Sequence, residues 1–464
     1  MRHARFFSCN VVTLEIRTGY EGSTNPHPVG CIGQELASWL AQLQELQEVT
    51  LPRFWLTTHV SRALSQLPRL LRVLYSHMHG GGNPLDTLNF KPISDPGVDS
   101  EIFFPSLVIL YQNAPFSQIT QFISSWKGSS NLVDLTLASQ LLETPDSFRS
   151  ALLVITDRCP LLLGLGLTSL ITPYLDHPRA APSRLRITLD DLLPLLKLNH
   201  LHSLDISHAL PLALTNDDFL VLIRGWPGME RLCLGSDPYP LDSRIVHVAR
   251  SPLSLSPTHN ADGPDPANAY PILGLWHAIR SLRIYCPYLT GLFLFGIDDF
   301  PTPDEQARIT ADEPPPNPFP YLTTVSFSMS LLTSEKTSVA LALSQYLLPD
   351  TTLTPNKPWG GDQDSEYLSH LNLKPLFSSY DQLSGELQEV MDSAEPTLPE
   401  PLSSFSPSLT LDEPIGFNGV LDEETDAELE RRVLLWDGVA EFLPVLSRAR
   451  RDERIKADKV MFSW

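Results

Sequence analysis

Apolar residues recur along the chain in the order L-x-x-L-x-L, with conservative replacements. The last two apolar positions of each copy lie two residues apart, so their side chains point to one face of a short strand. The first position lies three residues earlier, in the turn that leads into the strand. Ten copies predict ten strands of one kind: Val11–Leu14–Ile16, Leu46–Val49–Leu51, Leu70–Val73–Tyr75, Leu132–Leu135–Leu137, Leu162–Leu165–Leu167, Leu201–Leu204–Ile206, Met229–Leu232–Leu234, Leu289–Leu292–Leu294, Leu322–Val325–Phe327 and Leu368–Leu371–Leu373.

Helical patterns lie between several of these predicted strands. In residues 145–159, Phe148, Leu152 and Ile155 follow helical spacing after a start at Pro145 and Asp146. Residues 216–225, 269–286 and 334–346 show similar patterns. Strand, helix and turn therefore repeat at roughly 25–35 residues where the loops are short, which is typical of long leucine-rich units.

Such a unit can bury its apolar side only against its neighbours, so the units must stack. The sequence predicts an α/β fold, an irregular leucine-rich-repeat solenoid with a curved parallel sheet on the concave side and helices on the convex side. The alternative is a single α/β sandwich with a doubly wound sheet. The strands of such a sheet are continuous apolar runs, whereas the strands here keep polar residues between the leucines, which favours the solenoid.

The solenoid is predicted to occupy residues 1–374, with proline-rich insertions at 235–271 and 296–320. Each insertion holds seven prolines, and a smaller one covers 168–184. All three follow directly after a predicted strand, so we expect them to emerge on one rim of the solenoid. Insertions that share one rim often mark a binding face, but unselected loop growth on a tolerant scaffold gives the same pattern.

The last part of the chain divides into an acidic segment and a helix. The net charge is −21, and residues 347–430 hold eighteen Asp and Glu residues against Lys357 and Lys374. Residues 375–420 are rich in Ser and Pro and are predicted to form a disordered linker. Residues 421–456 predict an amphipathic helix that caps the last repeat or, alternatively, binds a partner. Pro444 predicts a kink or a break inside this helix.

Composition excludes several classes of function. An acidic surface repels phosphate groups, so nucleic-acid binding is disfavoured. The longest apolar stretch, at 161–171, is too short to span a bilayer. Five cysteines without a C-x-x-C pair, and no signal-peptide pattern, favour a reducing compartment, the cytoplasm or the nucleus.

Local patterns that could indicate chemistry have simpler interpretations. His77 and His79 lack a third ligand at a suitable spacing for a metal. The acid pairs at 190–191 and 217–218 fall at predicted helix starts, where acids cap the backbone. We therefore predict no enzyme, no metal site and no cofactor.

The residues between the leucines of each strand point away from the core and are predicted to line the concave face. A mostly polar row with two phenylalanines near one end suits a peptide or protein ligand. Alternatively, the neighbouring proline-rich loop covers the phenylalanines. The predicted protein-binding residues are Asp134, Thr136, Ser203, Asp205, Arg231, Phe293, Phe295, Thr324 and Ser326.

Cys-Pro pairs precede two of the strands, at Cys159-Pro160 and Cys286-Pro287, and a closing helix carries Trp436. Together with the proline-rich insertions, these features resemble the F-box/leucine-rich-repeat proteins of basidiomycete fungi. The resemblance implies that an F-box binds the Skp adaptor of a cullin–RING (SCF-type) ubiquitin ligase while the repeats hold the substrate. No F-box is visible before the first repeat at Val11. Two hypotheses follow: a substrate-recognition module of such a ligase, or a ligase-independent interaction scaffold.

Overall fold

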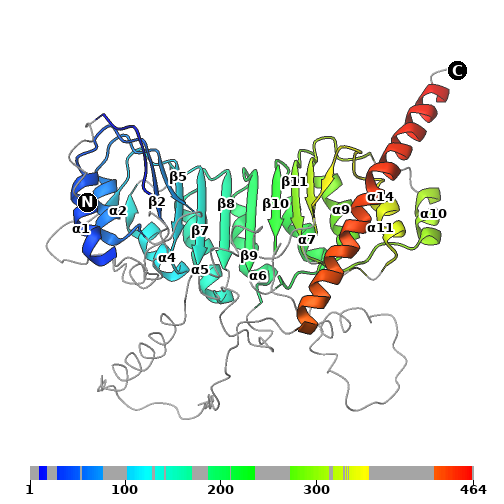
Figure 1. Cartoon of the computed structure of the whole chain (residues 1–464), viewed down its shortest axis with the longest axis horizontal. Helices are drawn as coiled ribbons and strands as arrows, with labels where there is room; N and C mark the ends of the chain where they lie inside the picture. The colour runs from blue at the N-terminus through cyan, green and yellow to red at the C-terminus, as the bar shows by residue number, and fades with distance from the viewer. Residues whose placement is uncertain are drawn as a thin grey trace, which may run out of the picture.

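The computed structural model describes residues 10–17, 29–52, 55–76, 102–127, 131–139, 143–169, 186–208, 211–235, 272–312, 317–327, 330, 332, 334–354 and 423–461. Its centre is one sheet of eleven parallel strands that lie side by side along the long axis of the molecule (Figure 1). The strands follow one another in the sheet in chain order. They are β1 (Thr13–Glu15), β2 (Glu48–Pro52), β3 (Arg72–Ser76), β5 (Ile109–Asn113), β7 (Asp134–Ser139), β8 (Gly164–Ser169), β9 (Ser203–His208), β10 (Arg231–Leu234), β11 (Gly291–Leu294), β12 (Thr324–Ser326) and β13 (Thr352–Leu353).

The strands pair in a register that places the central apolar residue of every repeat in one row across the sheet. This row is Leu14, Val49, Val73, Leu110, Leu135, Leu165, Leu204, Leu232, Leu292, Val325 and Leu353. A one-residue slip would turn each of these side chains to the opposite face, so burial of the row fixes the register. The predicted α/β class with a solenoid-like parallel sheet is confirmed.

Nine of the ten predicted strands lie in the sheet, and the tenth, at Leu368–Leu371–Leu373, lies outside the described residues. Two strands of this sheet were not predicted. In β5 the third apolar position is taken by Gln112, which is buried although polar. In β13 the first position is Asp350 and the third is Pro355, so only Leu353 keeps the pattern.

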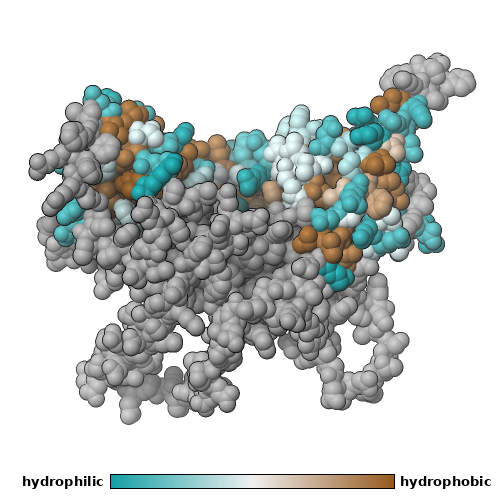
Figure 2. Space-filling model, viewed as in Figure 1, coloured by the Kyte–Doolittle hydropathy of each residue, from teal (hydrophilic) through white to brown (hydrophobic). Residues whose placement is uncertain are grey.

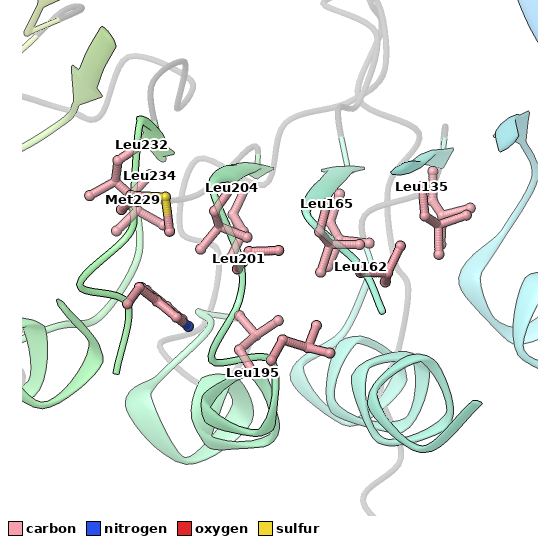
Figure 3. Close-up of a cluster of buried hydrophobic side chains, with 14 of the residues drawn as sticks. Leu135, Leu162, Leu165, Leu195, Leu201, Leu204, Met229, Leu232 and Leu234 are labelled. Atoms are coloured by element: carbon pink, nitrogen blue, oxygen red, sulfur yellow. The ribbon is translucent and has the colours of Figure 1, made fainter. Parts of the chain in front are cut away.

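Helices cover one face of the sheet, and the leucines of successive repeats fill the space between the two layers (Figure 3). The predicted helices appear as α5 (Pro145–Arg158), α7 (Asn216–Arg224), α9 (Leu275–Tyr285) and α11 (Lys336–Leu343). The sequence pattern did not predict several others. They are α1 (Val29–Leu40), α2 (Thr58–Ser65), α4 (Phe116–Ser125) and α10 (Pro303–Asp312), the last inside the proline-rich segment 296–320. The short α6 (Leu189–Leu192) lies at the helix start predicted from the acid pair at 190–191. Beside α4, β4 (Ile102–Phe103) and β6 (Trp126–Lys127) pair as a second, two-stranded sheet.

The ends of these helices are set by local hydrogen bonds. Thr215 and Asp218 form a reciprocal cap at the start of α7, in which each side chain accepts the other residue's backbone N–H. The acids predicted to lie at this helix start therefore act as caps. In the next repeat, Cys286 directly follows the end of α9. Its thiol donates toward the carbonyl oxygens of Ile223 and Trp226, which lie at and just beyond the end of α7 in the preceding repeat. Burial raises the pKa of this thiol to about 12, so its role is packing.

The terminal helix α14 (Glu423–Met461) crosses the C-terminal end of the molecule (Figure 1). Trp436, Val439 and Leu443 are buried, and the Trp436 ring lies 4.9 Å from that of Phe327. Of the kink or break predicted at Pro444, the break is wrong, since one helix continues through this residue. Pro444 removes one backbone hydrogen bond, but the buried residues on both sides hold the helix in place. The outward side carries the exposed Leu434. Figure 2 shows apolar colour at several places along this helix.

The predicted linker at 375–420 and the insertion at 235–271 fall almost wholly outside the described residues, as does most of the smaller insertion at 168–184. Gly235, at the end of β10, is described and has a φ of 59°. In this left-handed region glycine is favoured over other residues. Among the described residues, no helix is both long enough and apolar enough to cross a membrane.

Candidate functional site

The face of the sheet opposite the helices, called here the open face, is only partly covered. On β7 and β8 the residues alternate strictly between buried and half-buried. Because side chains on a strand alternate between the two faces, the half-buried residues all lie on the open face. Parallel sheets are normally covered on both faces, so a parallel sheet with a partly accessible face is unusual.

Most of the predicted binding residues do lie on the open face. Of the nine predicted residues, seven lie on this face: Arg231 is exposed there, and six others are half-buried. The register brings Asp134 and Ser203 onto the two strands that flank Gly164. It likewise aligns Asp205, Cys233 and Phe293 on three adjacent strands. The six half-buried residues are Asp134, Thr136, Ser203, Asp205, Phe293 and Thr324.

Two predicted residues do not belong to an accessible surface. Phe295 is buried because the chain around Leu212 and Leu273 packs with it over the C-terminal end of β10 and β11. Ser326 is fully buried, and its short side chain neighbours the much larger Phe293 in the register. The prediction that Phe295 and Ser326 lie on an accessible surface is therefore wrong. Strand alternation gives the direction in which a side chain points, but it does not show which other residues cover that side chain.

A phenol and a carboxylate meet in the middle of the open face. Tyr111 donates its hydroxyl to Oδ2 of Asp134 at 3.3 Å. Burial raises the pKa of the Asp134 carboxyl above its ordinary value, while the hydrogen bond from Tyr111 lowers it by a smaller amount. Burial and then the Asp134 charge raise the pKa of Tyr111. Asp134 is therefore a partly desolvated carboxylate on a surface that ligands can reach.

The two glycines of β8 leave room for the side chains of Asp134 and Thr136 on the neighbouring strand. A Cβ atom at Gly164 would lie 3.0 Å from Asp134 Oδ1, and one at Gly166 would lie 3.0 Å from Thr136 Oγ1. The side chains of β7 thus lean over a strand that has no side chains of its own at these positions. The glycines form a low stretch between β7 and β9, called here the glycine floor.

Aromatic rings flank this floor on the open face. On the β7 side, Tyr111 lies on the open face beside Asp134, and its ring centroid is 6.4 Å from that of Tyr75, which occupies the core-side position of β3. On the opposite side of the floor, the guanidinium of Arg231 lies 5.5 Å from the ring centroid of Phe293, in cation–π geometry. Aromatic side chains and arginine are the residue types that contribute most to binding energy in protein interfaces.

No family model matches the chain. No curated protein matches it either. Among solved structures, a protein from Bacteroides fragilis is similar over 49% of this chain and 67% of that one, with 15% sequence identity and a TM-score of 0.26. A likeness this distant carries no argument about function.

A second polar feature lies at the C-terminal ends of the strands and is buried. Glu143 accepts hydrogen bonds from the Phe116 backbone N–H at 2.9 Å and from the hydroxyls of Ser139 and Ser147. Its own N–H donates to the hydroxyl of Ser169 at 2.9 Å, and its carbonyl oxygen accepts from His208 Nε2 at 3.1 Å. Glu143 therefore ties together four successive repeats.

The described residues contain no group of three or more His, Cys, Asp or Glu side chains that could hold a metal ion. A small hollow beside β10 is lined by Leu212, Leu214, Leu234, Gly235, Leu273 and Phe295, without a polar side chain. His77 and His79 lie outside the described residues.

Asp134→Asn is expected to raise the melting temperature at pH 7. The raised pKa means that the folded state binds the Asp134 proton more tightly than the unfolded state does. This carboxyl therefore favours folding below its ordinary pKa, and the benefit is lost as pH rises through the higher folded pKa. Asparagine keeps an acceptor for Tyr111 without the charge. Thermal unfolding between pH 4 and 8, with Asp217→Asn as an exposed control, measures the effect; a lower melting temperature for Asp134→Asn at pH 7 would contradict it.

Proposed function

We propose that this chain is a protein-binding module that uses the open face of its sheet. The observation that carries the proposal is a parallel sheet with one partly accessible face, in which the side chains on β7 and β8 alternate between the core and that face. The accessible side chains there are polar, aromatic and arginine residues. They build a surface, without a convergent set of catalytic groups in the described part of the chain.

The second part of the proposal concerns the cellular process that the bound protein partner serves. The F-box/leucine-rich-repeat resemblance favours substrate recognition for a cullin–RING ubiquitin ligase. A scaffold that binds the same partner without a ligase uses the same surface. Co-purification of the tagged full chain distinguishes them, because the ligase role requires the Skp adaptor and a cullin to accompany the partner, and a scaffold brings the partner alone.

Blocking the open face tests the proposal. In the double variant Thr136→Arg/Ser203→Arg, two long charged side chains project from half-buried positions on β7 and β9. The control Leu153→Arg/Val221→Arg places the same residues on the helices, at positions 45% and 43% exposed. We expect quantitative affinity purification to show partners that the control retains and the open-face variant loses. Equal recovery by both folded variants would refute the proposal.

A further inference from the structure

The charges on the open face are not all balanced within the protein. Near the N-terminus, Glu15 pairs with Arg17 at 2.8 Å, and Glu48 on β2 pairs with Arg72 on β3 at 3.2 Å. In the middle of the sheet the pattern changes. Asp134 accepts only from the Tyr111 hydroxyl and Asp205 only from the Ser207 hydroxyl, at 3.3 and 3.1 Å, and neither forms an ion pair with another described residue.

These two carboxylates lie on either side of the glycine floor. Asp134 is on β7, Asp205 is on β9, and Gly164 and Gly166 of β8 lie between them in the register. Asp134 is level with Gly164 and Asp205 with Gly166, so the aspartates lie diagonally across the floor. Two strand spacings across the sheet and two residues along it separate their backbones by about 12 Å. The Asp134 carboxylate already leans over Gly164. A cationic side chain laid on the floor would meet a carboxylate on both sides.

The next strand adds a charge of opposite sign. Arg231 on β10 is the register partner of Ser203 on β9, and it lies over the Phe293 ring. From β7 to β10 the open face therefore runs from Asp134, over the glycines of β8, to Asp205 and then to the positive charge of Arg231. An extended segment that crosses these strands is complementary when a basic residue comes first and an acidic or aromatic residue follows.

We infer that the occupant of the open face is an extended protein segment that places an arginine or lysine on the glycine floor between Asp134 and Asp205. This inference rests on the proposed protein-binding function. Burial of one carboxylate without a cation is unfavourable, and a ligand cation would remove that cost. Arginine fits best, because its planar guanidinium can lie flat on backbone and donate in two directions.

Selection of displayed random 12-residue peptides on the intact chain tests the inference. We expect the selected peptides to share one basic position. Replacing that residue by glutamine should weaken binding about tenfold or more, as should Asp134→Asn/Asp205→Asn in the protein. The matched control Asp157→Asn/Asp217→Asn removes two charges from helices α5 and α7 and should leave the affinity unchanged.

Three outcomes are distinguishable. Peptides with a basic position and the aspartate dependence support the inference. Peptides that compete at the open face, being lost in Thr136→Arg/Ser203→Arg, but that show no basic preference overturn the inference and leave the proposed function in place. Peptides that bind the open-face variant and the parent chain equally overturn both.

Discussion

Trp436→Ala is expected to release the terminal helix from the last repeats. Trp436 is 2% exposed, and its indole Nε1 donates to the Ser330 carbonyl at 2.9 Å while its ring packs on Phe327. Replacing a buried tryptophan by alanine costs about 3–5 kcal/mol of unfolding free energy. Because each repeat contacts mainly its neighbours, the loss should fall on β12, α11 and β13 and leave β7 to β9 unaffected.

Hydrogen exchange measured by mass spectrometry resolves this local effect. Peptides covering residues 324–353 should exchange much faster in the variant, while those covering 134–208 keep their protection. Leu434→Ala is the matched control, since Leu434 lies on the same helix but is 64% exposed, and it should change stability by less than about 0.5 kcal/mol. Unchanged protection of residues 324–353 in Trp436→Ala would show that α14 does not stabilise the end of the sheet.

Glu143→Ala is expected to destabilise the central repeats by about 3–4 kcal/mol. The substitution removes the carboxylate that accepts from the Phe116 N–H and from the hydroxyls of Ser139 and Ser147, although the Ser147 hydroxyl keeps the Thr144 carbonyl oxygen as an acceptor. Each buried donor left unsatisfied costs roughly 1–3 kcal/mol, and the costs are not fully additive. The lost bonds join the repeat of α4 to the repeat of β7, so the substitution should lower the cooperativity between these two repeats as well as the midpoint of unfolding. The bonds to Ser169 and His208 use the Glu143 backbone and remain in the variant.

Chemical denaturation of the intact chain checks both parts. Glu143→Gln keeps one carbonyl oxygen in place and should lose clearly less than the alanine variant. Ser147→Ala removes one hydroxyl donor and leaves the carboxylate its other two partners, so it should cost about 1 kcal/mol. If the alanine and glutamine variants unfold at the same denaturant concentration, the hydrogen bonds of Glu143 do not hold the repeats together.

The repeating strands could be predicted because one physical requirement recurs in each of them. Each strand needs two apolar residues that are separated by one residue, and a third apolar residue three positions before them. These side chains fill the space between the sheet and the helices. β5 was missed because the polar residue Gln112 occupies one of those positions. Gln112 is buried only because residues of neighbouring repeats cover it, and the local sequence does not show this. Helix α10 was missed because prolines dominate its surroundings, although Pro303 stands at its start, where proline is tolerated.

The candidate site could be predicted only in part. Strand alternation correctly placed Asp134, Asp205 and Arg231 on the open face. It could not show that Phe295 and Ser326 are covered, since the covering residues come from other repeats. It also could not reveal the floor at Gly164 and Gly166, because that depends on which strands neighbour β8. Glu143 gave no signal, since its partners are spread over four repeats.

The lengths of the strands carry a consequence for solubility. The six-residue strands β7, β8 and β9 lie in the middle of the sheet, and its ends are β1 with three residues and β13 with two. An exposed sheet edge invites pairing with another chain, and short edge strands are one way in which proteins prevent it. A second molecule that approached either end would gain only two or three residues of ladder. The sheet can therefore be long without acting as a template for its own aggregation.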